Sequence, residues 1–358
     1  MAEGMRMRIS ASEKYKNDLD AVIRGTSGLD ELYCRRIVVT GAGGMLGSFL
    51  VDTLLRINDV CGTGMTVYAA GRNTDRLKER FGIRRDISFL KHDLLQPPGF
   101  EDLSPHYIIH AAGNSDPAAF NTDPTGTLIG NINGTYELLK YAGRNGCYRF
   151  LYVSSGEVYG IGEPDVESYD ESCSGYVDPL SVRSCYPMSK RAAENLCVSY
   201  SGQYHLDTVI VRPCHIYGPG FRSGDSHAYV QFLKDALAGK DIVMKSAGAQ
   251  IRSYIYVADC VSGILTALLQ GKNCQAYNIA NPDSTVSVAG LAKEIAVAAG
   301  VNVTFENPDE KDVRDRSPIP RQVLNSDKLA SLGFRPVFGI SEGIRHTYEI
   351  LQSCEENQ

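Results

Sequence analysis

The sequence predicts an α/β fold in which a doubly wound parallel sheet is joined to a smaller α/β part. Short apolar runs with the length of buried strands alternate with segments of helical apolar spacing, and this alternation is typical of parallel sheets with helices on both faces. A cluster of glycines follows the first apolar run and opens the first helical segment. The expected strands are residues 35–40, 66–70, 87–90, 107–113, 150–153, 208–211 and 276–279.

The composition excludes several classes of protein. The 358-residue chain is 43% hydrophobic and 22% charged, which is typical of a globular protein. Its net charge of -6 and pI of about 5.7 give no reason to expect binding to nucleic acid or to an anionic membrane. No run approaches the roughly 20 apolar residues of a membrane span, and the polar N-terminus lacks a signal core. The ten cysteines have no zinc-site spacing. We therefore expect a cytoplasmic protein with reduced thiols and no metal.

Gly41, Gly44 and Gly47 form a G-x-x-G-x-x-G pattern between the first strand and the first helix. In that position the first glycine allows a tight turn, the second lets the backbone approach a pyrophosphate, and the third lets the helix pack on the strand. The N-terminus of the helix offers free N–H groups to the phosphates. The pattern predicts a Rossmann-like dinucleotide-binding fold, and the alternative is a glycine-rich turn without a ligand.

Arg72 bears on the choice of cofactor. Enzymes that prefer NAD often carry an acidic residue at the end of the second strand, where it binds the ribose hydroxyls. This chain has Arg72 there, with no carboxylate beside it, and an arginine suits the 2′-phosphate of NADP. Arg72 alone slightly favours NADP over NAD. The alternative to a role in cofactor binding is an exposed arginine that starts the helix 75–81.

A reaction centre is predicted where residues 154–160 end the strand 150–153. Downstream, Tyr186 and Lys190 are four residues apart and so share a helix face. We expect the ammonium of Lys190 to favour the phenolate of Tyr186 and to lower its pKa from about 10 towards the working pH. A serine hydroxyl at the strand end could hydrogen-bond the same substrate oxygen. Such a trio can take a proton from an alcohol while a hydride leaves the same carbon. Without a cofactor site, the pair would be an ordinary tyrosine and lysine on a solvated face.

The chain is expected to divide into three parts. Residues 1–34 form an N-terminal extension, with short helices from Asp18 to Ile23 and from Leu29 to Tyr33 packed on the outside of the body. Residues 35–212 form the dinucleotide-binding domain. Residues 213–350 form mainly a smaller substrate-binding subdomain that is interleaved with the first.

Some further elements are expected from local signals. Asn131 should open a helix through Leu139, and the stretch 212–220, rich in proline and glycine, should form a functional loop. Other helices are expected at 75–81, 189–196, 232–238, 259–269 and 288–299, and around Lys328 and Ile344.

Taken together, these residues resemble the extended short-chain dehydrogenase/reductase family of NAD-dependent nucleotide-sugar epimerases, dehydratases and decarboxylases. The resemblance runs from about Arg35 to Ile350. It rests on an ordered set of matches: Gly41/Gly44/Gly47, Asp93-Leu94, His110-Ala111-Ala112, Asn131 with Gly134-Thr135, Ser154-Ser155 with Val158-Tyr159-Gly160, Tyr186/Lys190, Arg212-Pro213 with Tyr217-Gly218-Pro219, and Arg252 with Asp259.

The resemblance implies roles for individual residues. The implied catalytic residues are Ser155, Glu157, Tyr186 and Lys190. The implied cofactor-binding residues are Gly41, Gly43, Gly44, Met45, Leu46, Gly47, Arg72, Asp93, Leu94, Ala111, Ala112, Gly113, Asn131, Ser154, Tyr186, Lys190, Pro213 and His215. The implied substrate-binding residues are Ser115, Ser155, Gly156, Glu157, His215, Arg222, Arg252 and Arg316, with Arg252 and then Arg316 as first choices for the diphosphate.

The resemblance also implies ligands and an assembly. The cofactor is NAD, with NADP as the alternative, and the substrate is a nucleoside diphosphate sugar, taken to be a UDP-sugar. A homodimer is implied through the helices 131–143 and 186–200. A role in polysaccharide biosynthesis follows from that substrate class.

The branch within the family is the finer question. Dehydratases carry Asp-Glu where this chain has Gly156-Glu157, and UDP-glucuronate decarboxylases carry Thr-Ser-Glu. Ser155-Gly156-Glu157, the stretch from Asp178 to Tyr186, and Gln250-x-Arg252 resemble the decarboxylases. Gly156, His215 and Arg72 depart from them. The sequence therefore favours decarboxylation of UDP-glucuronate to UDP-xylose. A 4-epimerase, a 4,6-dehydratase and an NADP-dependent sugar reductase stay open. A non-enzymatic nucleotide sensor is disfavoured because both Tyr186 and Lys190 are present.

Overall fold

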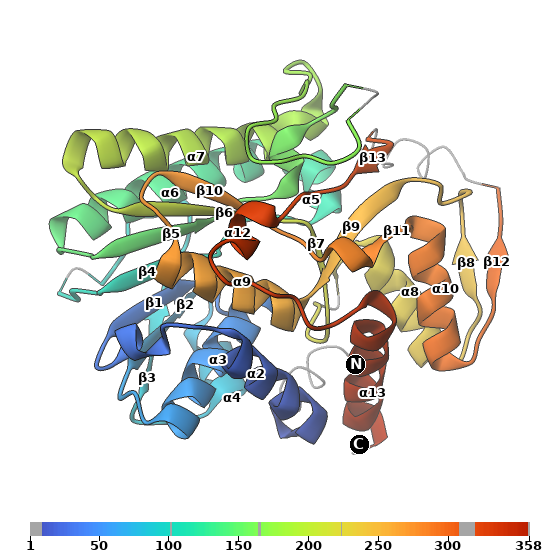
Figure 1. Cartoon of the computed structure of the whole chain (residues 1–358), viewed down its shortest axis with the longest axis horizontal. Coiled ribbons are helices and arrows are strands. Elements are labelled where there is room, and N and C mark those ends of the chain that lie inside the picture. The colour runs from blue at the N-terminus through green and yellow to red at the C-terminus, as the bar shows by residue number, and fades with distance from the viewer. Residues whose placement is uncertain (1–8, 101, 164–165, 223, 308–318, 357–358) are drawn as a thin grey trace.

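The centre of the fold is a fully parallel sheet (Figure 1). The computed structural model describes residues 9–100, 102–163, 166–222, 224–307 and 319–356. In this part of the chain, the seven strands of the main sheet have the order β10-β6-β5-β4-β1-β2-β3. The chain builds the sheet outward from β1 to β3 and then crosses back to β4, so the order reverses between β1 and β4, where ligands bind at the carboxyl ends of the strands. The strands are β1 (Arg36–Thr40), β2 (Thr66–Gly71), β3 (Ile87–Lys91), β4 (Tyr107–His110), β5 (Arg149–Val153), β6 (Thr208–Pro213) and β10 (Gln275–Ile279).

Helices cover both faces of this sheet, which confirms the predicted doubly wound fold (Figure 1). Alternate residues of a strand face opposite sides. In β1, Ile37 and Val39 pack in the core with the helices α3 and α9, whereas Val38 packs in the core with α6 and α7. The helices of the sheet are α3 (Met45–Cys61), α4 (Thr74–Phe81), α5 (Pro117–Thr122), α6 (Pro124–Arg144), α7 (Cys185–Tyr204) and α9 (Val257–Gln270).

A smaller mixed part follows, as predicted. The strand β9 (Ile251–Tyr256) pairs with β7 (His215–Tyr217), β11 (Thr285–Ser287) and β13 (Arg321–Gln322), and β8 (Ile242–Met244) pairs with β12 (Val303–Phe305). Its helices are α8 (Ala228–Leu237), α10 (Val288–Ala299), α12 (Asp327–Ala330) and α13 (Ile340–Glu356). The strand β10 lies in this half of the sequence but completes the edge of the main sheet. The exact division of the chain at residues 34 and 212 stays a prediction.

Two local expectations were wrong. Asn131 does not open a helix, because α6 begins at Pro124, where Asp123 accepts a hydrogen bond from the backbone N–H of Gly126. A proline in the first turn and an aspartate before it are a strong helix start. The stretch 212–220 is not only a loop, because His215–Tyr217 form β7, which pairs in parallel with β9. This strand is invisible locally since its partner lies far along the chain.

The N-terminal segment is tied to three other elements. Helix α2 (Glu13–Gly25) is longer than expected and buries Tyr15, Asp18, Leu19 and Val22. The hydroxyl of Tyr15 donates to Asp52 of α3 at 2.6 Å. Asp18 accepts from the hydroxyl of Tyr256 at 2.6 Å and from Nδ1 of His346, on α13, at 2.8 Å. The helix therefore connects α3 to β9 and α13.

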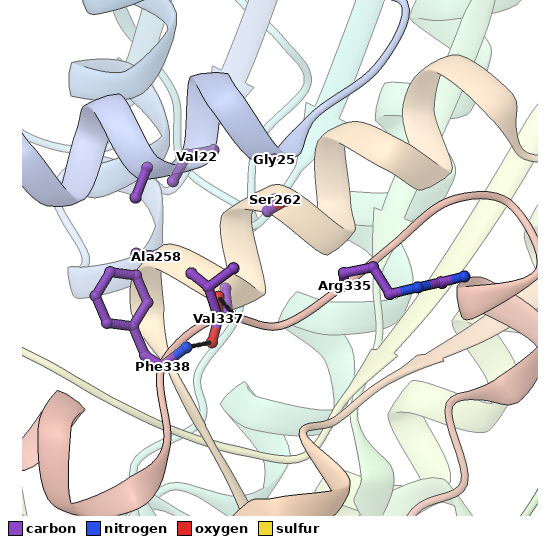
Figure 2. Close-up of a pocket in the computed structure, with 9 residues that line it drawn as sticks. Val22, Gly25, Ala258, Ser262, Arg335, Val337 and Phe338 are labelled. Carbon is purple, nitrogen blue, oxygen red and sulfur yellow. Dashed lines mark hydrogen bonds between the residues drawn. The ribbon is translucent and has the colours of Figure 1, made fainter.

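A narrow hollow lies between α2, α9 and the loop before α13 (Figure 2). Asp259, one of the residues that line it, accepts hydrogen bonds from the backbone N–H groups of Val337 and Phe338, both at 2.9 Å. Burial raises the pKa of Asp259 to about 7. None of the predicted site residues lines this hollow. We therefore regard it as a packing feature that fixes the start of α13.

Within the described ranges, no helix combines the length and the apolar character needed to cross a membrane. The cellular location stays a prediction.

We expect Asp18→Ala to lower the free energy of unfolding by about 2–4 kcal/mol, because the buried hydroxyl of Tyr256 would lose its acceptor. Urea unfolding followed by circular dichroism measures this. Asp30→Ala, which removes an exposed carboxylate of the same segment, is the control and should change the stability by less than about 0.5 kcal/mol. Equal stabilities for the two variants would show that α2 is only loosely attached.

Candidate active site

The glycines of the turn between β1 and α3 let the backbone pack closely at the sheet's switch point. Gly41 has φ +73°, and a Cβ there would lie 2.8 Å from the carbonyl oxygen of Ala111. A Cβ on Gly47 would overlap the carbonyl oxygen of Gly41, so this helix can approach the strand only with glycine at that position. Gly44 caps α3 without a side-chain hydrogen bond, which leaves the first N–H groups of the helix bare. Gly43 belongs to this turn, and Met45 and Leu46 begin α3.

Polar groups around the turn fit a dinucleotide. The hydroxyl of Ser154 is buried and has no hydrogen-bond partner among the described residues, so it is available to a ligand. The backbone N–H of Ala112 donates to the Thr40 hydroxyl at 3.1 Å, which holds the end of β4 against β1. Gly113 lies next to Asn131 and Lys190. Bare helix N–H groups, a backbone without side chains and an unpartnered hydroxyl together suit a phosphate-containing cofactor.

The other predicted cofactor residues also lie at the carboxyl ends of the strands. Asp93 and Leu94 follow β3, and Leu94 packs against Gly134 of α6. Arg72 is exposed at the end of β2. Pro213 ends β6 and His215 begins β7.

Tyr186 and Lys190 lie in the first turns of α7, and both are buried. The ammonium of Lys190 donates to the carbonyl oxygen of Val153, at the end of β5, at 2.9 Å. The carboxamide of Asn131 donates to the hydroxyl of Ser189 at 2.9 Å, and that hydroxyl donates to the carbonyl oxygen of Tyr186 at 2.8 Å. These bonds fix the start of α7 against β5 and α6.

The expected low pKa of Tyr186 is wrong for the protein by itself. Burial raises the pKa of Tyr186 to about 12, although the nearby Ser155 hydroxyl lowers it, and the charge of Glu157 raises it further. Burial also lowers the pKa of Lys190 to about 8. The ammonium lies 5.8 Å from the centre of the Tyr186 ring, and removing both groups from water opposes both charges. The sequence showed the pair but not how deeply it is buried.

Glu157 is held by an arginine. Nη1 and Nη2 of Arg183 lie 3.1 and 3.4 Å from the two carboxylate oxygens of Glu157, and both side chains are partly buried. The guanidinium of Arg183 also lies 5.7 Å from the ring centre of Phe120. Phe120 in turn stacks on Tyr186, with ring centres 4.7 Å apart and planes at 16°. A stack of Arg183, Phe120 and Tyr186 therefore connects Glu157 to the predicted catalytic tyrosine.

The sequence gives little sign of this stack. Arg183 lies in the stretch from Asp178 to Tyr186, three residues before the tyrosine, and this position is its only local signal. Phe120 lies on α5, more than sixty residues from Tyr186, and nothing in its local sequence distinguishes it from a core residue.

Gly156 faces the C-terminal half. A side chain at Gly156 would meet the Leu324 side chain at 3.1 Å, and the carboxamide of Gln322 donates to the carbonyl oxygen of Gly156 at 2.9 Å. Ser155 caps the short helix η3 (Gly156–Tyr159) by accepting from the N–H of Glu157 at 3.2 Å. The space beside position 156 is thus filled from β13 and the residues after it.

Two predicted substrate residues, His215 and Arg252, lie close to the Glu157–Arg183 pair. Arg252 is buried, and it donates to the carbonyl oxygens of Ile251 at 2.9 Å and Ile319 at 2.6 Å. The charges of Glu157 and Arg183 both act on Arg252. Burial, with Arg252 nearby, lowers the pKa of His215 to about 3, so its ring is neutral at working pH.

The other predicted substrate-binding residues are either exposed or outside the described residues. Ser115 is exposed in the loop between β4 and α5. Arg222 is exposed and lies near Arg72, whose positive charge acts on it. Arg316 lies outside the described residues. The roles assigned to all the predicted site residues stay predictions.

A glycine turn at the switch point of a parallel sheet, next to a buried tyrosine and lysine, is the arrangement that the sequence predicts for a nucleotide-dependent oxidoreductive site. The family model described as "NAD dependent epimerase/dehydratase family" matches residues 37–280. The chain belongs to this family and is an enzyme of NAD-dependent nucleotide-sugar modification.

Individual relatives are similar over most of the chain. UDP-glucuronic acid decarboxylase 1 of Xenopus tropicalis is 31% identical over 335 residues, which cover 92% of this chain and 75% of that protein. UDP-glucuronic acid decarboxylase 6 of Arabidopsis thaliana is 32% identical over 311 residues, which cover 86% of each. Among solved structures, the UDP-N-acetylglucosamine 4-epimerase of Methanobrevibacter ruminantium has the same fold, with a TM-score of 0.76 at 21% identity over 90% of this chain and 99% of that one.

We expect Gly47→Ala to lower the free energy of unfolding by about 1–3 kcal/mol and to weaken NAD binding, because the new Cβ would displace α3 from the Gly41 turn. Urea unfolding and isothermal titration with NAD measure the two effects. Gly202→Ala is the control, because a Cβ on this residue of α7 meets nothing within 4 Å. If Gly47→Ala bound NAD as tightly as Gly202→Ala, the α3 N-terminus would not be the phosphate site.

Proposed function

We propose that the enzyme converts UDP-glucuronate to UDP-xylose and CO2 through a 4-keto intermediate. The observation that carries this proposal is the Glu157–Arg183 pair beside Tyr186, with Arg252 close to both. Two guanidinium groups and one carboxylate leave a net positive site next to the predicted catalytic tyrosine. With Arg252 on the diphosphate, as the resemblance implies, Arg183 is the guanidinium that suits a sugar bearing a carboxylate. The curated relatives named above, at 31% and 32% identity, support the same reaction.

The first step assigns a task to each residue of the buried trio. When bound, the oxidised nicotinamide would accept hydride from C4 of the sugar and return it at the end of the cycle. Tyr186 takes the proton of the 4-hydroxyl, while Ser155 donates a hydrogen bond to the same oxygen. The ammonium of Lys190 lies 5.8 Å from the centre of the Tyr186 ring, and a positive charge near a phenol favours its ionised form.

Loss of CO2 follows from the ketone. With a ketone at C4 and a carboxylate on C5, the substrate is a β-keto acid. The bond between C5 and the carboxylate breaks, CO2 leaves, and the electron pair passes into the enolate of C4 and C5. A proton from solvent, passed on by a water that Glu157 holds, replaces the carboxylate on C5. Tyr186 returns its proton to the 4-oxygen when the ketone is reduced. Arg183 can exchange its Glu157 partner for the substrate carboxylate, because both present the same two oxygens.

Position 156 argues against dehydration. A 4,6-dehydratase uses an acid at this place to expel the C6 hydroxyl, and Gly156 has no side chain. The space next to it is taken by Leu324. An acidic residue would have to displace Leu324.

A 4-epimerase is the second candidate. Arg183 contacts both oxygens of Glu157, and a carboxylate held in this way is poorly suited to proton transfer. If Glu157 has only a structural role, the 4-keto sugar would rotate within the site and receive hydride on its other face. No CO2 would then be lost.

The test is to incubate the enzyme with NAD and UDP-glucuronate and to identify products by mass spectrometry and proton NMR. We expect a pentose nucleotide and CO2. Tyr186→Phe should lower turnover by about 10²- to 10⁴-fold while keeping NAD affinity. Glu157→Gln should slow CO2 release more than oxidation at C4. A product of unchanged mass would reject decarboxylation in favour of 4-epimerisation.

For the cofactor, we propose that Arg72 lets the enzyme accept NADP in addition to NAD. Arg72 is exposed at the end of β2, and Arg222 and Arg76 add positive charge nearby. We expect Arg72→Asp to weaken NADP binding at least about tenfold and to leave NAD binding equal or tighter, because a carboxylate repels the 2′-phosphate and accepts from the ribose hydroxyls. Titration of both cofactors measures the ratio. An unchanged ratio would show that Arg72 does not contact the ribose.

The homodimer stays a prediction. Helices α6 and α7 leave Ile129, Tyr136, Val198 and Tyr204 exposed.

A further inference from the structure

The charged ammonium of Lys190 is buried, and burial is unfavourable for a charge. Its side chain is 4% exposed, and burial lowers the pKa of its ammonium to about 8. One of its three N–H groups donates to the carbonyl oxygen of Val153. A lysine that favours the phenolate of a neighbouring tyrosine must stay protonated at working pH. The surroundings of Lys190 must therefore compensate for part of its lost hydration.

The neighbouring titratable groups compensate only in part. Glu194, one turn further along α7, attracts the ammonium, but Arg212 donates to both of its carboxylate oxygens, at 2.9 and 2.7 Å. Burial lowers the pKa of His110, on β4, well below its ordinary value, so His110 is neutral. Burial raises the pKa of the Cys197 thiol well above its ordinary value, so this thiol is neutral as well.

The ring of Tyr152 lies next to the ammonium of Lys190. Nζ of Lys190 is 4.8 Å from the ring centre, within the roughly 6 Å over which the negative face of an aromatic ring attracts a cation. Tyr152 is 1% exposed, and the side chains of Phe150, Ala193 and Cys197 belong to the same core cluster. A desolvated contact of this kind is the strong form of a cation–π interaction.

On the strand β5, Tyr152 comes one residue before Val153, whose carbonyl oxygen binds the lysine. Tyr152 points towards α6 and α7, like Phe150, whereas the backbone of Val153 presents its oxygen to Lys190. The hydroxyl of Tyr152 is buried near Thr135 and makes no hydrogen bond of ordinary geometry within the described chain. A buried hydroxyl without a partner does not stabilise the fold. The contact of the ring face with the Lys190 ammonium is therefore the interaction that this side chain can contribute.

We propose that Tyr152 is a positioning residue whose ring face keeps the ammonium of Lys190 protonated and directed towards Tyr186. The task is the same for every reaction that Tyr186 and Lys190 could carry out. It does not depend on UDP-glucuronate being the substrate.

The test measures the protonation of Lys190 without any substrate. Each form of Tyr152 is paired with its own Lys190→Met derivative, and the free energy of unfolding of both is followed from about pH 6 to about pH 11. Because the folded-state pKa of about 8 lies below the unfolded value of 10.5, the unfolded chain binds more protons between them. The stability of the lysine form relative to the methionine form therefore rises with pH across this window.

Replacing the ring should move the start of this rise. With Tyr152→Met, which keeps a large apolar side chain without a ring, we expect the rise to begin about one pH unit lower, a tenfold weaker hold on the proton. With Tyr152→Phe, which keeps the ring and removes only the hydroxyl, we expect it to begin where it does in the natural protein. Incorporation of 3,5-difluorophenylalanine at position 152 keeps the shape of phenylalanine and weakens the negative charge on the ring face. The rise in stability should then begin at a pH between the values for Tyr152→Met and Tyr152→Phe.

If the rise in relative stability began at the same pH for Tyr152→Met, Tyr152→Phe and the fluorinated ring, the proposal would be overturned. If Tyr152→Met fails to fold, the comparison of phenylalanine with its fluorinated form still decides. As a second readout, the high-pH limit of turnover with the active nucleotide sugar should fall by the same amount in Tyr152→Met, with little change in its KM. A loss of activity at all pH values, without a shift of this limit, would indicate a merely structural role and would also overturn the proposal.

Discussion

The burial of the Lys190 ammonium against the end of β5 is the constraint on which the rest of the site depends. The hydrogen bond to the Val153 carbonyl fixes the start of α7 on the sheet, and Tyr186, four residues earlier on the same helix, is presented next to Ser155 as a consequence. The same burial disfavours the charges of both residues, which is why the pKa of Lys190 falls to about 8 while that of Tyr186 rises to about 12. The reactive state of the pair must therefore be restored by what surrounds it.

Two layers surround the pair. Below it, the core between β5 and α7 supplies an aromatic ring and a carbonyl oxygen to the lysine. Beside it, the ring of Phe120 stacks on the tyrosine. The guanidinium of Arg183 lies over the same ring and binds Glu157. The glycine turn brings the predicted phosphate site to the same edge of the sheet, because Gly113 after β4 lies next to both Asn131 and Lys190. One edge of one sheet thus contains the predicted hydride, proton and carboxylate chemistry.

Local signals predicted the fold well and the site only in outline. The apolar runs gave the seven strands of the main sheet to within a few residues, since a buried parallel strand is marked by its own composition. The start of α6 was missed because Asn131 resembles a helix opening while Asp123 and Pro124 form the actual one. The strand β7 and the stack of Phe120 on Tyr186 depend on partners far along the chain, and the pKa of Tyr186 depends on burial. None of these is encoded within a short window of sequence.

We propose that Tyr186 and Lys190 serve an oxidation at C4 that is reversed within one catalytic cycle. The test is rapid mixing of the NAD-loaded enzyme with UDP-glucuronate, followed by the near-ultraviolet absorbance of reduced nicotinamide. We expect the absorbance to rise in a single turnover and to return to its starting value as the product forms. A permanent rise that matches the amount of product would contradict the account, because the enzyme would then be a simple dehydrogenase that consumes its cofactor.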